Sequence, residues 1–154
     1  SEWATWRDLR LRSLADAPDA FCADVNTERA HPDAWWDDLV SSTAAHPRGA
    51  LWSAEVDGHP AGIAFSRIDG AGVLHLGSMW VAPEGRSRGL GRALVEAALD
   101  WGRSGGASSA ELWVTLGNGH AEALYENAGF EDTGDRDALR DGSNLEIARM
   151  VREL

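Results

Sequence analysis

The chain has 154 residues, enough for one domain, residues 1–154, with a single core. Hydrophobic residues make up 44% and charged residues 25%, and no apolar run approaches the ~18 residues of a membrane span, so we expect a cytoplasmic protein without membrane partners. The 14 basic and 25 acidic residues give a formal net charge of −11, which opposes binding to nucleic acid.

The first fifty residues predict helices. Apolar residues recur on or near one face over residues 3–15, which indicates a helix that Ser1 can cap. Pro18 lies in a segment that should end this helix, because proline cannot continue one. Pro32 suits the first position of a later, tryptophan-rich helix. The remaining segments are expected to be helical at residues 20–29 and 32–40 and a loop at residues 41–49.

The middle of the chain predicts antiparallel strands. Strand-favouring residues alternate on both sides of Asp57-Gly58, a dipeptide typical of a two-residue hairpin turn. A second turn over residues 69–72 leads into a further strand, which Pro83 should end because it cannot donate to a ladder. The three strands are expected at residues 51–56, 61–68 and 73–81.

A glycine-rich turn, Arg-Ser-Arg-Gly-Leu-Gly, follows the third strand at residues 86–91. From Gly89 the apolar residues change to a helical period, which predicts a long helix. Glycines let the backbone approach a ligand, and the start of a helix favours an anion. Three nearby arginines add positive charge: Arg86, Arg88 and Arg92. The turn therefore indicates a phosphate or pyrophosphate site, with a merely structural tight turn as the alternative.

The last third of the chain predicts a strand, a helix and two further strands. Asn118 is placed to cap the helix and Gly129 to close it, and a charged loop separates the last two strands. The strands are expected at residues 110–114, 130–133 and 145–151, and the helix at residues 118–128.

Two blocks of the sequence resemble the GCN5-related N-acetyltransferases, the GNAT family. Residues 112–130 look like that family's strand, Asn, helix and ALYE..GF segment, and residues 11–21 look like an actinobacterial branch whose acceptors are mostly unassigned. The other block matches the family's acyl-CoA signature V-x-P-x-x-R-x-x-G-x-G at Val81, Pro83, Arg86, Gly89 and Gly91.

The resemblance implies the GNAT fold, an α+β architecture with a central, mostly antiparallel mixed β-sheet flanked by helices. Acyl-CoA would lie in the cleft between two splayed central strands, its pantetheine arm paired with the backbone of Met79 and Val81. The family also has a strand before its first helix, so we expect that strand to be missing from this sequence. The implied coenzyme A contacts are Met79, Trp80, Val81, Arg86, Ser87, Arg88, Gly89, Gly91, Arg92, Asn118, Ala121 and Tyr125.

By the same resemblance, the chain would move an acetyl group from acetyl-CoA directly to a primary amine, with no metal. Tyr125 takes the family's position for the acid that protonates the departing thiolate. Tyr125 also belongs to an apolar helical stripe, so a core tyrosine is the alternative. Asn118 could likewise act only as a helix cap.

The expected general base is His75. Strand alternation puts His75 on the face of Met79 and Val81, and His-Leu-Gly here resembles the His-Leu-His of arylalkylamine N-acetyltransferases. Histidine titrates near neutral pH, so His75 is expected to take the proton of the amine through water. A half-buried histidine without chemistry, Glu55 as the base, or a neutral amine that needs no base are the alternatives.

The acceptor is expected to enter beside Phe21 and Glu28, because in the family the loop between the first two helices covers that side of the cleft. The tryptophan-rich helix at residues 32–40 predicts a closed aromatic wall, which favours a small-molecule amine over a peptide acceptor. A homodimer is an open alternative to a monomer. Two other classes also stay open: a non-catalytic acyl-CoA-binding module and a non-enzymatic ligand-binding domain.

Overall fold

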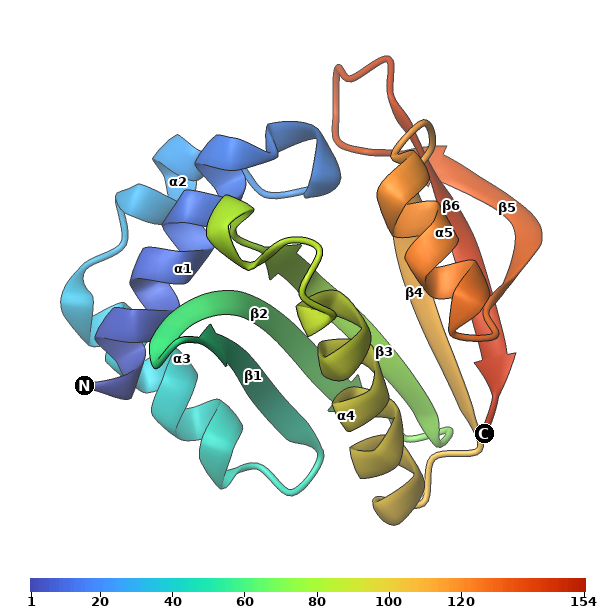
Figure 1. Cartoon of the computed structure of the whole chain (residues 1–154), viewed down its shortest axis with the longest axis horizontal. Helices are drawn as coiled ribbons and strands as arrows, with labels where there is room; N and C mark the ends of the chain where they lie inside the picture. Colours follow the sequence, from blue (N-terminus) through green and yellow to red (C-terminus); the bar gives the residue numbers. More distant parts are fainter.

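The computed structural model describes residues 1–154 as a six-stranded sheet with helices on both faces (Figure 1). The strand order is β1-β2-β3-β4-β6-β5, and every neighbouring pair is antiparallel except β3 and β4, which are parallel. The predicted α+β class and mostly antiparallel mixed sheet are confirmed. No helix combines the length and the apolar content that crossing a membrane requires.

The elements follow the chain from blue to red in Figure 1. The strands are β1 (Gly49–Val56), β2 (His59–Ile68), β3 (Val73–Val81), β4 (Ser109–Thr115), β5 (Glu131–Ala138) and β6 (Glu146–Glu153). The helices are α1 (Glu2–Asp16), α2 (Val25–Arg29), α3 (Asp33–Ala45), α4 (Leu90–Ser104) and α5 (Gly119–Asn127), with 3₁₀ turns η1 (Pro18–Ala20) and η2 (Pro83–Gly85). β2 and β5 are longer than predicted, and the charged loop before β6 is correspondingly shorter.

The predicted helix over residues 20–29 was partly wrong, because α2 covers only Val25–Arg29. Pro18 opens the short turn η1, and the chain then becomes extended before a new helix starts. The Asp24 carboxylate starts α2 by accepting the N–H groups of Asn26 and Thr27, each at 3.0 Å. A helix cap within the predicted helix is thus what divides it.

The predicted loop over residues 41–49 was too long, because α3 continues to Ala45 and β1 begins at Gly49. Ser41 fits the helix by donating its hydroxyl to the Asp37 carbonyl at 2.7 Å, so its polar side chain does not break the helix. Pro32 precedes α3 as its N-cap residue rather than opening the helix.

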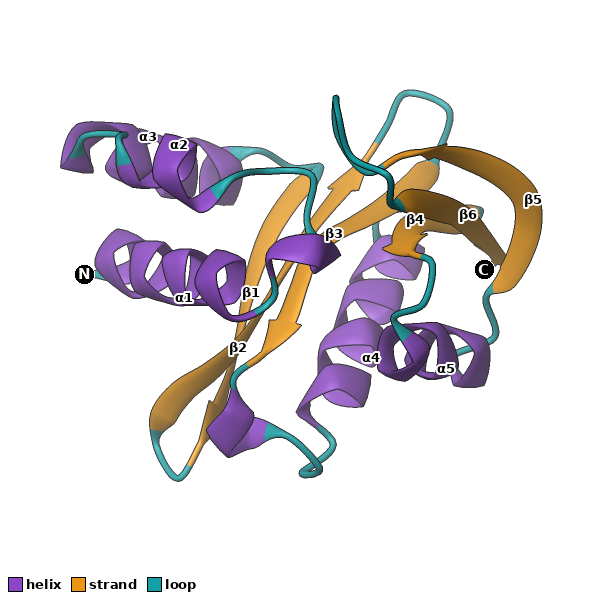
Figure 2. Cartoon of the chain, turned by 90° about the horizontal axis from the view of Figure 1, so that it is seen from above, coloured by secondary structure: helices purple, strands orange, loops and turns teal.

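Two apolar cores lie on opposite faces of the sheet, and Figure 2 shows the helices on either side of it. α4 and α5 cover one face, where Leu74 of β3 packs with Leu99 of α4. α1 and α3 cover the other face, where Leu9 of α1 and Trp36 of α3 pack with Ile63 of β2. This packing holds α4 so that its first turn lies just after the end of β3.

A bulge at Ser78 reverses the faces of β3. Gly77 pairs with Phe65 and Trp80 pairs with Ile63, so β3 carries one extra residue between these pairs. Ser78 adopts a φ of 53°, which bends the strand at that point. One extra residue inverts the alternation of side chains, so odd-numbered residues point to different faces before and after the bulge.

The bulge makes the predicted placement of His75 wrong. His75 follows Leu74, which packs under α4, so the His75 side chain points to the opposite face, the α1 side. Met79 packs with the core under α4, and Cγ2 of Val81 lies 3.8 Å from where a Cβ on Gly91 would be. His75 therefore lies on the face opposite to Met79 and Val81.

β3 and β4 diverge, as Figure 1 shows. They pair only from Val73–Ser109 to His75–Glu111, whereas β3 stays paired with β2 and β4 with β6 along their length. The sheet thus opens into two halves, β1-β2-β3 and β4-β6-β5, beyond those few pairs. The predicted splay of two central strands is confirmed.

We expect Gly102→Ala to destabilise the protein although alanine favours helices. A Cβ at Gly102 would lie 2.7 Å from Cδ2 of Leu74, a fully buried side chain. Overpacking should therefore outweigh the roughly 1 kcal/mol gained in helix propensity, and the free energy of unfolding in urea should fall by about 1 kcal/mol or more. Gly119→Ala is the control, because no atom lies within 4 Å of its added Cβ. An equal loss in Gly119→Ala would contradict the packing argument.

Candidate functional site

The loop between η2 and α4 presents a run of free backbone donors. The N–H groups of Gly85 and Arg86 donate to the carbonyls of Ala82 and Pro83. The next paired amide is that of Ala93, which donates to the Gly89 carbonyl at 3.0 Å. The N–H groups of residues 87–92 donate to no protein acceptor. Left-handed backbone at Ser87 and Gly89, with φ of 61° and 77°, turns part of this loop towards the start of α4. Such an arrangement suits an anion.

The three arginines of this loop are each paired with a carboxylate. Arg86 bonds to Asp16 of α1. Arg88 lies 3.2 Å from Asp57 in the β1–β2 turn, and Arg92 lies 2.7 Å from Glu96 one turn along α4. The last two pairs are well exposed, so they can exchange for another anion at little cost. The backbone amides and the dipole of α4 are therefore free to attract an anion, whereas each arginine already has a carboxylate partner.

Asp16 connects α1 to the end of β3. Its carboxylate accepts from the Trp80 indole N–H at 2.9 Å as well as from Arg86, and Arg86 Nε donates to the Val81 carbonyl at 3.1 Å. The Trp80 hydrogen bond is the largest cause that lowers the pKa of Asp16. A carboxylate at a helix C-terminus is disfavoured by the helix dipole, and these two donors offset that. The Trp80 side chain packs beneath α1, so only its backbone can meet a ligand on the other face.

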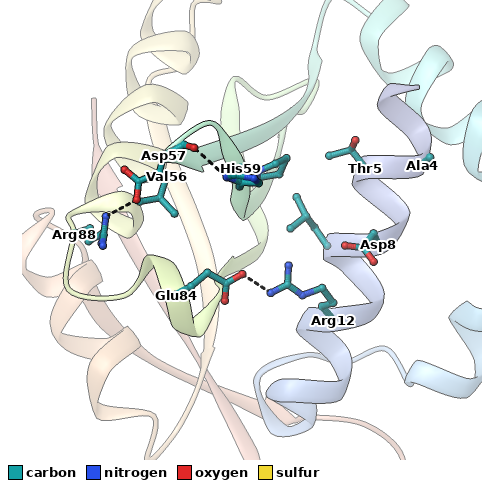
Figure 3. Close-up of a pocket in the computed structure, with 11 residues that line it drawn as sticks. Ala4, Thr5, Asp8, Arg12, Val56, Asp57, His59, Glu84 and Arg88 are labelled. Carbon is teal, nitrogen blue, oxygen red and sulfur yellow. Dashed lines mark hydrogen bonds and ion pairs between the residues drawn. The ribbon is translucent and has the colours of Figure 1, made fainter.

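A cavity of about 720 Å³ separates α1 from the β1–β2 turn and η2 (Figure 3). Arg12 of α1 reaches across it to Glu84 at 2.6 Å, and Arg88 reaches Asp57 on the other side. The sequence did not predict these partners, because each joins residues from different parts of the chain. The two ion pairs hold the η2 segment and the following loop against α1 and the β1–β2 hairpin.

The predicted residues of α5 lie beside α4. Asn118 caps the helix by accepting the Ala121 N–H at 3.4 Å, as predicted. Tyr125 is buried in an edge-on contact with Phe130, with ring centroids 6.2 Å apart, and burial raises its pKa. Gly91 of α4 lets α5 lie close, because a Cβ at Gly91 would lie 3.3 Å from the Leu124 side chain. Tyr125 thus has the apolar surroundings of a core residue.

His75 sits where β3 and β4 separate. Its Nε2 lies 2.8 Å from Asp69 and its Nδ1 lies 3.2 Å from Glu111, which also binds Arg149. Both ring nitrogens face carboxylate oxygens, so neither is directed at the space between the strands. The hydrogen bond from His75 holds the pKa of Asp69 at about 2. No group of three His, Cys, Asp or Glu side chains is arranged to hold a metal ion.

The predicted acceptor residues are engaged with Arg10 of α1. Its guanidinium lies 3.1 Å from Glu28 and 5.1 Å from the centre of the buried Phe21 ring. Both residues therefore help to attach α2 and the preceding loop to α1. The predicted aromatic wall was wrong, because Trp35 and Trp36 lie on α3, which packs on α1 and the edge strand β1, away from the divergence of β3 and β4.

A smaller cavity, of about 490 Å³, lies between η1 and the turn from β4 to α5. Two carboxylates line it, those of Asp16 and Asp19, together with Thr115 and Asn118, and no basic side chain does. The residues that line it are Asp16, Ala17, Pro18, Asp19, Ala20, Thr115, Leu116, Gly117, Asn118 and Leu145. Both carboxylates already face arginines, because Asp16 bonds to Arg86 and Asp19 lies 3.8 Å from Arg140.

Known proteins resemble this chain in sequence and in fold. A model of the acetyltransferase (GNAT) family matches residues 5–130. Mycothiol acetyltransferase from Beutenbergia cavernae is 31% identical over 133 residues, which cover 84% of this chain and 41% of that protein. Aminoglycoside N(6′)-acetyltransferase type 1 from Klebsiella aerogenes is 27% identical over 136 residues, covering 84% of this chain and 83% of that protein.

Among solved structures, a GCN5-related N-acetyltransferase from Kribbella flavida superposes with a TM-score of 0.79 at 23% identity, covering 99% of this chain and 92% of that one. The chain spans about two fifths of the length of the mycothiol acetyltransferases that it matches.

We expect Asp69→Asn to lower stability at neutral pH and to lose this effect in acid. Folding lowers the pKa of Asp69 from 3.8 to about 2, so the native state gains stability above the unfolded value and loses it as the pH falls through the folded value. Asparagine keeps an oxygen for the N–H groups of Ala71 and Val73, so the turn should survive. In urea unfolding, the gap between variant and wild type should close from about pH 4 to about pH 2. A constant gap would show that the ionised carboxylate contributes nothing.

Proposed function

Because the chain belongs to the acetyltransferase (GNAT) family, we propose that it transfers an acetyl group from acetyl-CoA directly to a primary amine of a small molecule. One observation carries this proposal. The unpaired N–H groups of residues 87–92 lie at the start of α4, and only the short turn η2 separates them from β3, a strand that diverges from its neighbour. A donor with a pyrophosphate and an extended amide arm needs both features.

The donor would use backbone more than side chains. The amides of residues 87–92 and the dipole of α4 suit the pyrophosphate. Beyond the last pair with β4, the edge of β3 is free, and the pantetheine arm would pair with that edge like an added strand. The Val81 carbonyl already accepts from Arg86, so the Val81 N–H and the backbone of Met79 remain for pairing. Asn118 uses only its side-chain oxygen in the helix cap, so its amide N–H groups would be free to donate to the pantetheine arm.

Tyr125 suits the role of proton donor. In the reaction, the amine nitrogen attacks the thioester carbon, the carbon–sulfur bond breaks, and the departing thiolate takes a proton. Burial raises the pKa of Tyr125, so its phenol keeps a proton to give at neutral pH. The thiolate would approach this hydroxyl between α5 and the end of β3.

The amine must also lose a proton. We propose that the group formed by Asp69, His75 and Glu111 receives it through water, because this group lies at the last paired residues of β3 and β4. Direct transfer to His75 does not fit the geometry, since a carboxylate faces each ring nitrogen. An amine that arrives neutral would need no base at all.

For the acceptor we propose a small molecule with one or more amino groups. Relatives named mycothiol acetyltransferase and aminoglycoside acetyltransferase support this class. The cavity beside Asp16 and Asp19 would admit a small molecule, but both carboxylates already face arginines, so it supplies no free charge for an ammonium. Phe21 and Glu28 would then shape the loop beside that cavity rather than touch the acceptor. A cytoplasmic location and a homodimer stay predictions.

The direct test is release of coenzyme A thiol by the purified chain. Acetyl-CoA would be offered with an aminoglycoside, an amino sugar and a short peptide with a free N-terminus, and thiol release above the hydrolysis rate is expected with at least one of the two small amines. Release with the peptide alone would overturn the acceptor class. Binding of CoA by calorimetry without release for any amine would make the chain a non-catalytic module.

Tyr125→Phe should lower kcat on the order of 10²-fold and change the KM for acetyl-CoA much less, because a proton donor acts mainly in the transition state. The ring stays in place against Phe130, so stability should change little. Thiol release at saturating acetyl-CoA measures the effect. Wild-type kcat in this variant would make Tyr125 a packing residue only.

Gly89→Val should weaken CoA binding about tenfold or more, or about 1.4 kcal/mol, because a branched side chain would stand among the amides of residues 87–92. Gly89 has a φ of 77° and open space around it, so the variant also carries backbone strain. Gly106→Val is the matched control, with a φ of 83° and open space at the other end of α4. Equal CoA affinities of the two variants in calorimetry would remove the phosphate site from this loop.

A further inference from the structure

The segment that follows α1 crosses from one half of the sheet to the other. We call residues 16–21 the strap. At one end, the Asp16 carboxylate accepts from Trp80 of β3 at 2.9 Å. Further along, the Asp19 carbonyl accepts from the Thr115 hydroxyl of β4 at 2.6 Å. β3 and β4 have no hydrogen bonds to each other at this level, so the strap joins them where their own pairing has ended.

A third contact ties the strap to the far half of the sheet. Arg140, in the loop between β5 and β6, donates to the Phe21 carbonyl at 2.8 Å and to the Pro18 carbonyl at 3.3 Å. In Figure 1 the blue chain after α1 reaches towards the orange turn between β4 and α5, and Figure 2 shows the same approach from above. The two halves of the sheet are therefore joined twice, by β-pairing at one end and by the strap at the other.

We propose that the strap fixes the separation of β3 and β4, and that Thr115, Trp80 and Arg140 are positioning residues for the acyl-CoA arm. The ligand in this inference rests on the proposed function, whereas the bracing of the strands does not. An arm that pairs with β3 needs a gap of constant width, because backbone hydrogen bonds tolerate little change in distance. Asp16 also holds Arg86, so the same strap sets the loop that would receive the pyrophosphate.

The hydroxyl of Thr115 is well suited to this task. Thr115 is a buried polar residue, 6% exposed, and the carbonyl of Asp19 is its only side-chain partner. Valine has nearly the same shape and no hydroxyl, so Thr115→Val removes the hydrogen bond without opening a cavity. Trp80→Phe removes the other anchor, the indole N–H that Asp16 accepts. Serine at position 115 would restore the hydroxyl.

Two controls match these variants. Trp52→Phe removes an indole N–H that bonds to Ser66 at the same 2.9 Å, and Thr133→Val removes a hydroxyl that bonds to the Arg149 carbonyl at 3.2 Å. Both lie away from the strap. Hydrogen exchange of the Ala17 and Ala20 amides, which donate to the Ser13 and Ala17 carbonyls, measures the bracing without any ligand. Calorimetry with CoA measures the effect of the bracing on binding.

Thr115→Val and Trp80→Phe should each speed exchange at Ala17 and Ala20 about tenfold and raise the Kd of CoA by a similar factor. The KM for acetyl-CoA should rise more than kcat falls. Thr115→Ser and both controls should stay near wild type. Unchanged exchange in both strap variants would overturn the bracing. Faster exchange with an unchanged Kd for CoA would overturn the positioning role. If the wild type binds no CoA, the proposed function fails, while the exchange result still decides whether the strap braces the strands.

Discussion

The early end of pairing between β3 and β4 is the constraint on which the rest of the structure depends. Backbone N–H and C=O groups rarely stay unpaired in a folded protein, yet these two central strands stop exchanging hydrogen bonds after His75 and Glu111. Two strand edges then face each other across a gap, and an extended ligand in this gap would supply the missing hydrogen-bond partners. α4 begins just after the end of β3, which brings its unpaired amides to the mouth of that gap. One feature of the sheet thus aligns both parts of the proposed donor site.

Much of this was predictable from the sequence, because the signals are local. The hairpin turn at Asp57-Gly58, the helix cap at Asn118 and the glycine turn before α4 each depend on a few neighbouring residues. The faces of β3 were not predictable, because nothing in Gly77-Ser78-Met79 marks a bulge, and alternation across it placed His75 on the wrong face. A period-two pattern fails as soon as one residue is inserted.

The partners of the arginines were also beyond the sequence. Arg86 was expected beside a phosphate, whereas it meets Asp16, 70 residues away in the chain. The loop therefore carries less free positive charge than its composition suggests. Acidic residues outnumber basic ones, 25 to 14, so carboxylate partners for the arginines are abundant. Attraction for an anion comes from backbone dipoles, which keep their strength when nearby side chains are neutralised.

The strap also has a consequence for the order of folding. Its contacts to Thr115 and Arg140 join residues 96 and 119 positions apart, among the longest separations in the chain. Contacts that close such long loops form late, because the chain loses conformational entropy on closing the loop before the contact contributes any stabilising free energy. The hairpin β1–β2 and the packing of α4 on β3 need only local closure and can form first. The two halves of the sheet would then meet last, so a newly made chain acquires the geometry between β3 and β4 only when its C-terminal strands are in place.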